Sequence, residues 1–159
     1  MLRLRLHLIH IVIILTLIFA DQYSKELILE LAATLPVQMA SFFNIVLAWN
    51  SGITFGLFNN GGDLVFNIIS WGTIAVSAFL VFLMAKEKCL AKSIPLALII
   101  GGAIGNIMDR FKHGAVIDFL DFHLSGYHWP AFNFADSFIV IGVCLYLATS
   151  YIKEKNEKI

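Results

Sequence analysis

A stretch of 21 residues without a charged side chain, Leu64 to Met84, restricts the possible folds of this chain more than any other feature. About 20 apolar residues in a helix are enough to cross the hydrocarbon core of a bilayer. Of all 159 residues, 59% are hydrophobic and only 14% are charged, which is not the composition of a soluble globule. The sequence therefore predicts a single α-helical membrane domain with four transmembrane helices, at about residues 6–27, 64–84, 94–111 and 134–152.

The first apolar segment could be mistaken for a secretory signal peptide, because it follows Arg3 and Arg5 and reaches Ala20. A cleavable signal needs a small residue where this chain has Ile18, and the apolar pattern continues as far as Ala32. We therefore expect a retained helix.

Lysine and arginine are distributed unequally between the ends of the predicted spans. The segment 34–63 contains neither residue type, and the segment 112–133 contains only Lys112. The positive-inside rule therefore predicts cytoplasmic termini, with 34–63 and 112–133 as outer loops. The formal net charge of zero gives no reason to expect a nucleic-acid partner. The eight residues on the predicted cytoplasmic side are Arg3, Arg5, Lys86, Lys88, Lys92, Lys153, Lys155 and Lys158.

Three carboxylates, Asp118, Asp121 and Asp136, lie among aromatic residues between two apolar segments. Ionisable groups beside hydrocarbon are costly, which indicates a functional role. Phe, Val and Ile around residue 118 favour a strand, in which Asp118 and Asp121 would point to opposite faces. Only one of these two would then face Asp136. A second β-favouring stretch, Phe42 to Trp49, lies in the other outer loop.

Asp118 and Asp136 are candidates for an acid–base pair. Two carboxylates held close together share one proton, and such a pair suits amide hydrolysis, with the ionised member taking a proton from water. Asp136 is expected to be ionised more often, because it lies in the first turn of the fourth helix. Asn133 lies near the cap of that helix, so a purely capping role for Asp136 remains an alternative.

Asp21 and Lys25 are four residues apart and share one face of the first helix, where they can form an ion pair. This pair has either a purely structural role or a role in supporting a site.

The third helix places Gly102, Asn106, Asp109 and Arg110 within an arc of about 100°. Gly101 and Gly105 form a small-xxx-small pattern that favours close helix packing. Asp109 and Arg110 are interpreted first as a buried charge pair that orders neighbouring backbone.

His113, His123 and His128 raise the alternative of a metal site, but no HxxxH or HExxH pattern is present, so no metal site is expected. Cys89 and Cys144 are interpreted as structural.

Five short motifs resemble those of one family, the lipoprotein signal peptidases, or signal peptidase II, which are bacterial aspartic peptidases of the inner membrane. The resemblance implies cleavage of prolipoproteins before a diacylglyceryl-modified cysteine, without a cofactor. It also implies a small extracytoplasmic sheet and a flap-like helix within residues 34–63. The motifs are Asp21 to Lys25 (DQYSK), Asn50 to Gly56 (NSGITFG), Gly101 to Arg110 (GGAIGNIMDR), Val116 to Phe119 (VIDF) and Phe132 to Asp136 (FNFAD).

By this resemblance Asp118 and Asp136 correspond to the catalytic pair near the outer face of the membrane. Thr54 departs from the family's more usual alanine or serine. A monomer in contact with membrane lipid is expected. A small proton- or cation-coupled transporter is the main alternative, and a structural assembly protein would leave the carboxylates unexplained. The residues that correspond to the support or lining of the site are Asp21, Lys25, Asn50, Gly52, Gly102, Asn106, Asp109, Arg110, Asn133 and Ala135.

Overall fold

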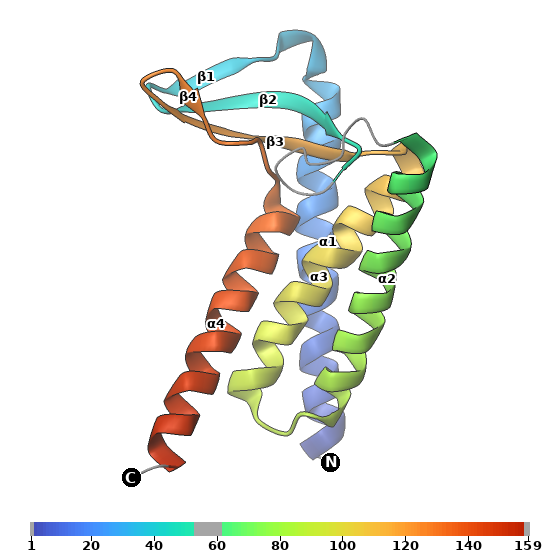
Figure 1. Ribbon diagram of the computed structural model, residues 1–159, viewed down its shortest axis with the longest axis vertical. Coiled ribbons are helices and arrows are strands. Elements are labelled where there is room, and N and C mark those ends of the chain that lie inside the picture. Colours follow the sequence, from blue (N-terminus) through green and yellow to red (C-terminus); the bar gives the residue numbers. More distant parts are fainter. Residues whose placement is uncertain (1, 53–61, 158–159) are drawn as a thin grey trace.

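Four long helices stand side by side, and a small sheet lies across one end of them (Figure 1). This computed structural model describes residues 2–52 and 62–157. The architecture confirms the predicted fold class of four apolar helices with a small sheet. The helices are α1 (Leu2–Glu30), α2 (Gly62–Lys86), α3 (Leu90–His113) and α4 (Phe134–Glu157), and a short 3-10 turn, Ala32–Thr34, follows α1.

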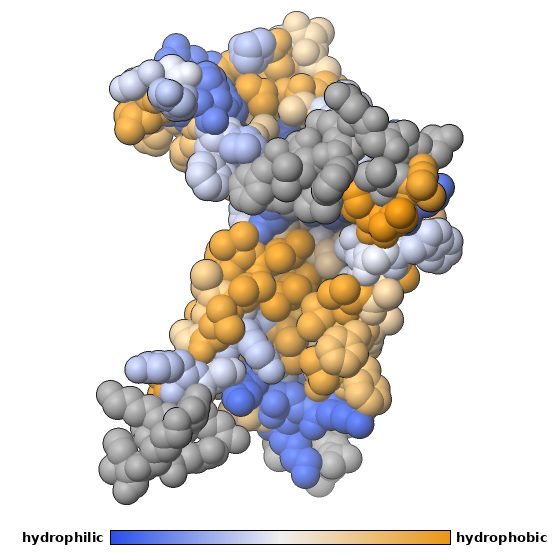
Figure 2. Space-filling view, viewed as in Figure 1, coloured by the Kyte–Doolittle hydropathy of each residue, from blue (hydrophilic) through white to orange (hydrophobic). Residues whose placement is uncertain are grey.

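All four helices are long and apolar enough to cross a membrane. Large apolar side chains such as Phe19 of α1, Trp71 of α2 and Leu147 of α4 are exposed. An apolar surface of this extent is stable against lipid rather than water. Figure 2 shows it as a hydrophobic zone over the helices, with hydrophilic residues gathered at the end remote from the sheet.

Helix α3 is the centre of the bundle. In its most apolar segment 56% of the residues are buried, whereas this share is 17% or less in each of the other three helices. Helix α3 also contacts all three of them. A Cβ atom added at Gly101 would lie 3.0 Å from Leu17 Cδ1 of α1, and one at Gly142 of α4 would lie 2.7 Å from Ile99 Cγ1 of α3. The predicted packing role of Gly101 is confirmed. The helix ends at Gly114, whose φ of 72° is left-handed and favours glycine.

The sheet is antiparallel in the order β1-β2-β3-β4. The register pairs Asn50 at the end of β2 with Val116 at the start of β3, directly beyond the end of α3. Ile117 and Phe119 of β3 pack on Ile28 of α1, which fixes the sheet to the bundle. The strands are β1 (Val37–Ala40), β2 (Phe43–Asn50), β3 (Val116–Leu124) and β4 (Tyr127–His128).

The described part of the 34–63 loop thus consists largely of β1 and β2. The described residues 35–52 of that loop contain no helix. Residues 53–61, where the departure at Thr54 falls, lie outside the described residues, and the expected flap-like helix stays a prediction there.

Candidate active site

Asn133 and Asp136 cap the first turn of α4 reciprocally. The Asp136 N–H donates to Asn133 Oδ1 at 2.9 Å, and the Asn133 N–H donates to Asp136 Oδ2 at 3.3 Å. This is the geometry of a capping box, so the predicted cap position of Asn133 is confirmed. Capping engages only one carboxylate oxygen of Asp136. The other, Oδ1, accepts a hydrogen bond from Asn106 Nδ2 at 2.9 Å.

Asp118 lies near the start of β3 and is buried. Its Oδ1 accepts a hydrogen bond from Asn133 Nδ2 at 2.7 Å, and its Oδ2 accepts one from Asn50 Nδ2 at 2.9 Å. Burial raises the pKa of Asp118 to about 7, and the nearby charge of Asp136 adds to this, although the two asparagine hydrogen bonds oppose it. Asn133 therefore bonds to two buried carboxyl groups, one of which has a pKa raised to about 7.

Lys25 of α1 lies between two further buried carboxylates. Its ammonium group is 2.7 Å from Asp21 Oδ2 and 2.8 Å from Asp109 Oδ2. The predicted pairing of Asp21 with Lys25 is thus present, with Asp109 as a third member. Lys25 also donates to Asn106 Oδ1 at 3.1 Å. Since Oδ1 of Asn106 faces the lysine, its NH2 group faces Asp136, so α1 orients a side chain that contacts the cap of α4.

Small residues allow α1, α3 and α4 to meet at this point. Asp21 Oδ1 accepts a hydrogen bond from the Ala135 N–H at 2.9 Å. A Cβ atom at Gly105 would lie 2.5 Å from Asp21 Oδ2, and one at Gly102 would overlap the Ala135 carbonyl oxygen. Gly102 and Gly105 thus allow the backbone of α3 to approach neighbouring elements closely, and Ala135 contributes a backbone donor.

Arg110 donates to backbone carbonyls. Its Nη2 donates to Gly52 O at 3.1 Å and its Nη1 to Asn106 O at 3.3 Å. The Gly52 N–H donates to Asn50 Oδ1 at 3.1 Å, so Arg110 and Asn50 together hold the chain after β2. Asp109 and Arg110 are buried and both order neighbouring backbone, since Asp109 Oδ2 accepts from the Ile117 N–H at 3.2 Å, but the expectation that they pair with each other was wrong. They point to different neighbours, because adjacent helical residues are about 100° apart around the axis.

Gln22 contributes to this cluster and was not predicted from the sequence. Its amide nitrogen donates to Asp109 Oδ1 at 2.8 Å, to Asp21 Oδ2 at 3.2 Å and to Gly105 O at 3.2 Å. The available signal was its place inside the DQYSK segment, on the helix that carries Asp21 and Lys25.

Asp121 has a different set of partners. Asn44 Nδ2 donates to its Oδ2 at 2.9 Å, and His128 Nδ1 lies 2.8 Å from its Oδ1. Burial opposes ionisation of Asp121, but the hydrogen bonds from His128 and Asn44 outweigh it and hold the pKa of this carboxyl below its usual value. The structure therefore separates Asp121 from the Asp118 cluster. Among the described residues, no three His, Cys, Asp or Glu side chains are grouped as metal ligands.

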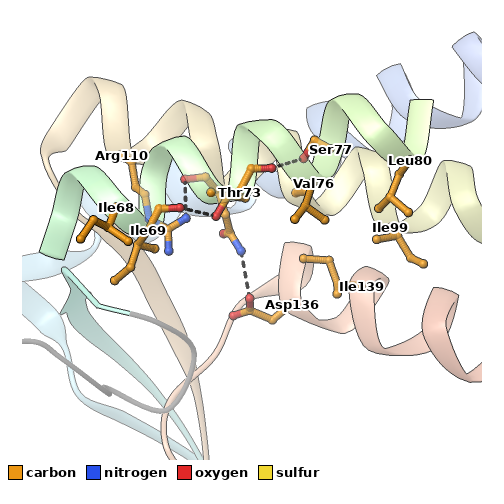
Figure 3. A pocket seen from close by; sticks show the side chains of 13 residues that line it. Ile68, Ile69, Thr73, Val76, Ser77, Leu80, Ile99, Arg110, Asp136 and Ile139 are labelled. Atoms are coloured by element: carbon orange, nitrogen blue, oxygen red, sulfur yellow. Dashed lines mark hydrogen bonds between the residues drawn. The ribbon is translucent and has the colours of Figure 1, made fainter. Parts of the chain in front are cut away.

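A cavity of about 440 Å³ extends along the bundle from this cluster. Asn106, Arg110 and Asp136 line it together with apolar residues of α2, α3 and α4, such as Val76 and Ile139 (Figure 3). Two hydroxyl groups of α2 also line the cavity, those of Thr73 and Ser77. Each donates its proton to the backbone carbonyl oxygen four residues earlier in α2. The cavity is thus apolar, with buried polar groups at the end nearest the sheet.

Residues 13–152 match the family described as signal peptidase (SPase) II. The chain is 40% identical to the lipoprotein signal peptidase of Anaplasma phagocytophilum over 156 residues, which cover 96% of this chain and 98% of that protein. It is 41% identical to the lipoprotein signal peptidase of Francisella tularensis subsp. novicida over 160 residues, covering 96% and 98% of the two chains. A solved bacterial membrane enzyme superposes with a TM-score of 0.77 at 31% identity, over 94% of this chain and 91% of that one.

Proposed function

Because this chain belongs to the signal peptidase II family of membrane aspartic peptidases, we propose that Asp118 and Asp136 are the catalytic pair with which it removes signal peptides from prolipoproteins. The observation that carries the proposal is the position of both buried carboxylates around Asn133, at the polar end of an apolar cavity.

The two carboxylates have different environments, which supports different roles. Asp136 is buried like Asp118, but it lies at the N-terminus of α4, where the helix dipole and donors from Asn106 and Asn133 partly offset the cost of ionising a buried carboxyl. Asp118 has its pKa raised to about 7, so it holds a proton at pH values below that. A general base and a general acid are thereby available together.

Asp136 takes a proton from a water molecule, whose oxygen attacks the carbonyl carbon of the scissile amide. Asp118 gives its proton to the carbonyl oxygen, and a tetrahedral diol results. When the C–N bond breaks, the leaving nitrogen takes the proton held by Asp136, while a diol hydroxyl returns its proton to Asp118 as the carboxyl group forms. General acid–base catalysis of this kind contributes typically about 10²–10⁴-fold.

The surrounding residues hold this pair in place. Lys25 fixes the orientation of the Asn106 amide, Asn133 bonds to both aspartates, and Asn50 bonds to Asp118. We assign these residues positioning roles, together with Asp21, Gly52, Gly102, Asp109, Arg110 and Ala135.

The cavity supports a lipid-modified substrate. Its wall on α2 runs from Ile68 to Leu80, which corresponds to roughly 18 Å of helix at 1.5 Å per residue. The acyl chains of a diacylglyceryl group suit this apolar wall. The scissile bond, on the N-terminal side of the modified cysteine, would then lie at the end of the cavity that Asp136 lines. The substrate then remains in the membrane during cleavage.

The protein is a multi-pass protein of the bacterial inner membrane. The distribution of lysine and arginine supports cytoplasmic termini and, with them, a position of Asp118 and Asp136 near the outer face. A monomer suffices, because the groups that surround the two aspartates come from one chain.

A cleavage assay with purified protein tests this function. The substrate is a diacylglyceryl prolipoprotein, its control is the same precursor without the lipid, and mass spectrometry identifies the new N-terminus. We expect cleavage of the lipidated precursor only, directly before the modified cysteine. Equal cleavage of both precursors, or cleavage at another bond, would contradict the proposed substrate.

A further inference from the structure

The start of α1 and the end of α2 lie at the end of the bundle remote from the sheet (Figure 1). A second cavity, of about 220 Å³, is lined by residues of these two segments. It is formed between the start of α1 and the end of α2, and its polar lining residues are His7, His10, Lys86, Glu87 and Lys88. We call it the terminal cavity. The proposed peptidase mechanism uses none of these side chains.

His10 provides the first observation that points to a ligand. The side chain is 98% buried, since only 2% of it is exposed, and its Nε2 lies 2.9 Å from Ser93 Oγ of α3. Its other ring nitrogen, Nδ1, is buried and has no hydrogen-bond partner among the residues that the structure describes. The single proton of the Ser93 hydroxyl has two acceptors within reach, His10 Nε2 at 2.9 Å and Leu90 O at 3.4 Å. When it goes to the nearer acceptor, Nε2, the ring proton of His10 is on Nδ1, which is then a donor without an acceptor. Such a buried group normally has a partner.

The charges around the terminal cavity favour an anion. Lys86 and Lys88 bring two positive charges, and Lys86 Nζ is held 4.0 Å from the centre of the Phe82 ring. Glu87 also lines the cavity, but its Oε1 accepts hydrogen bonds from the N–H groups of Lys88 and Cys89, both at 2.8 Å. The Glu87 carboxylate is therefore directed at backbone N–H groups. The two lysine charges exceed its single negative charge, so the net charge around the cavity is positive.

The depth of the terminal cavity matches that of lipid headgroups. It lies where the apolar part of α2 ends at Lys86, close to the first residues of the α1 span. A volume of about 220 Å³ holds much more than one water molecule, which takes about 30 Å³ in the liquid. Basic pockets between transmembrane helices at this depth bind anionic headgroups.

We propose that the terminal cavity binds a phosphate group, with Lys88 and His10 as donors, and that an anionic phospholipid of the surrounding bilayer supplies it. A phosphate oxygen accepts the hydrogen bond that His10 offers, and the lysine ammonium groups balance the charge. The site lies at the opposite end of the bundle from Asp118 and Asp136, so its occupation stabilises the ends of α1 and α2 without entering the proposed reaction.

Binding to the purified full-length protein in a non-ionic detergent tests the site. Calorimetric titrations use short-chain phosphatidylglycerol, short-chain phosphatidylcholine and inorganic phosphate as the probes. We expect phosphatidylglycerol to bind most tightly, with phosphatidylcholine weaker by about tenfold, because a choline group cancels the anionic charge. Equal affinity for the two lipids would overturn the proposal. If inorganic phosphate binds as tightly as phosphatidylglycerol, free phosphate is the ligand and the lipid source is wrong.

Lys88→Gln and Lys92→Gln form a matched pair of variants. Both remove one lysine charge at the same end of the bundle, but only Lys88 lines the terminal cavity. Lys88→Gln should weaken phosphatidylglycerol binding about tenfold, as expected for one charged hydrogen bond, while Lys92→Gln leaves it within about twofold. His10→Phe should weaken it similarly. Equal losses in both lysine variants would show unspecific attraction and overturn the site, and this comparison holds even if His10→Phe does not fold.

Discussion

Replacement of Lys25 by methionine should damage stability and catalysis together. The ammonium group lies between Asp21 and Asp109 at 2.7 and 2.8 Å, and all three side chains are at most 2% exposed. Removing one partner of a buried ion pair costs about 3–5 kcal/mol, because the remaining charge is left uncompensated. Here two carboxylates lose their cation, so we expect a loss in the upper part of that range.

The same substitution should slow cleavage through Asn106. Without Lys25, Asn106 Oδ1 keeps only the hydrogen bond from Asn133 Nδ2 at 3.1 Å, so the amide is held less firmly with its NH2 group towards Asp136. The loss of one hydrogen bond to a charged group, about 1.5–3 kcal/mol, corresponds to roughly a 10- to 100-fold slower reaction.

Chemical denaturation in mixed micelles measures the first effect, and single-turnover cleavage of a prolipoprotein measures the second. Lys112→Met is the control, because Lys112 forms an ion pair with Glu26 in which both side chains are more than half exposed. Exposed pairs contribute little, so this variant should resemble the wild type. The reasoning would be refuted if Lys25→Met and Lys112→Met had the same stability and cleaved at the same rate.

Three further predictions follow from the same contacts. Gly102→Ala should lower the free energy of unfolding by about 1–3 kcal/mol, because its Cβ overlaps the Ala135 carbonyl, whereas Gly72→Ala, with nothing within 4 Å, should raise it by up to about 1 kcal/mol in the same denaturation experiment. Gln22→Leu should slow cleavage about tenfold or more in a single-turnover assay, because Asp21 and Asp109 lose a shared donor, and an unchanged rate would show that the contacts of Gln22 do not support the site. Cleavage should fall as the pH rises through about 7, because Asp118 loses its proton there. The raised pKa of Asp118 should also make the free energy of unfolding fall as the pH rises from 3.8 to about 7, and Asp118→Asn should remove this pH dependence.

Features that depend on local periodicity were predictable from the sequence. The four apolar segments predicted the helices, the spacing of Asp21 and Lys25 predicted their ion pair, and Asn133 was recognised as the cap of α4. Each of these depends on residues that are at most a few turns apart, where helix geometry alone decides which side chains meet.

Contacts between distant segments were not predictable in the same way. Asp109 pairs with Lys25 of α1 rather than with its neighbour Arg110, because the packing of α1 on α3 determines which face meets which. The donation from Arg110 to Gly52 and the bond between His10 and Ser93 likewise join residues 58 and 83 positions apart. Helix periodicity showed which faces were polar, but it did not specify their partners.

The most direct test of the central proposal compares three aspartate-to-asparagine variants in purified, folded protein. Asp118→Asn and Asp136→Asn should each reduce cleavage of a diacylglyceryl prolipoprotein by at least about 10²-fold, because each removes a member of the acid–base pair. Asp121→Asn is the matched control on the same strand as Asp118, with partners outside the cluster, and should retain cleavage. Full cleavage by folded Asp118→Asn or folded Asp136→Asn protein would contradict the assignment of the catalytic pair.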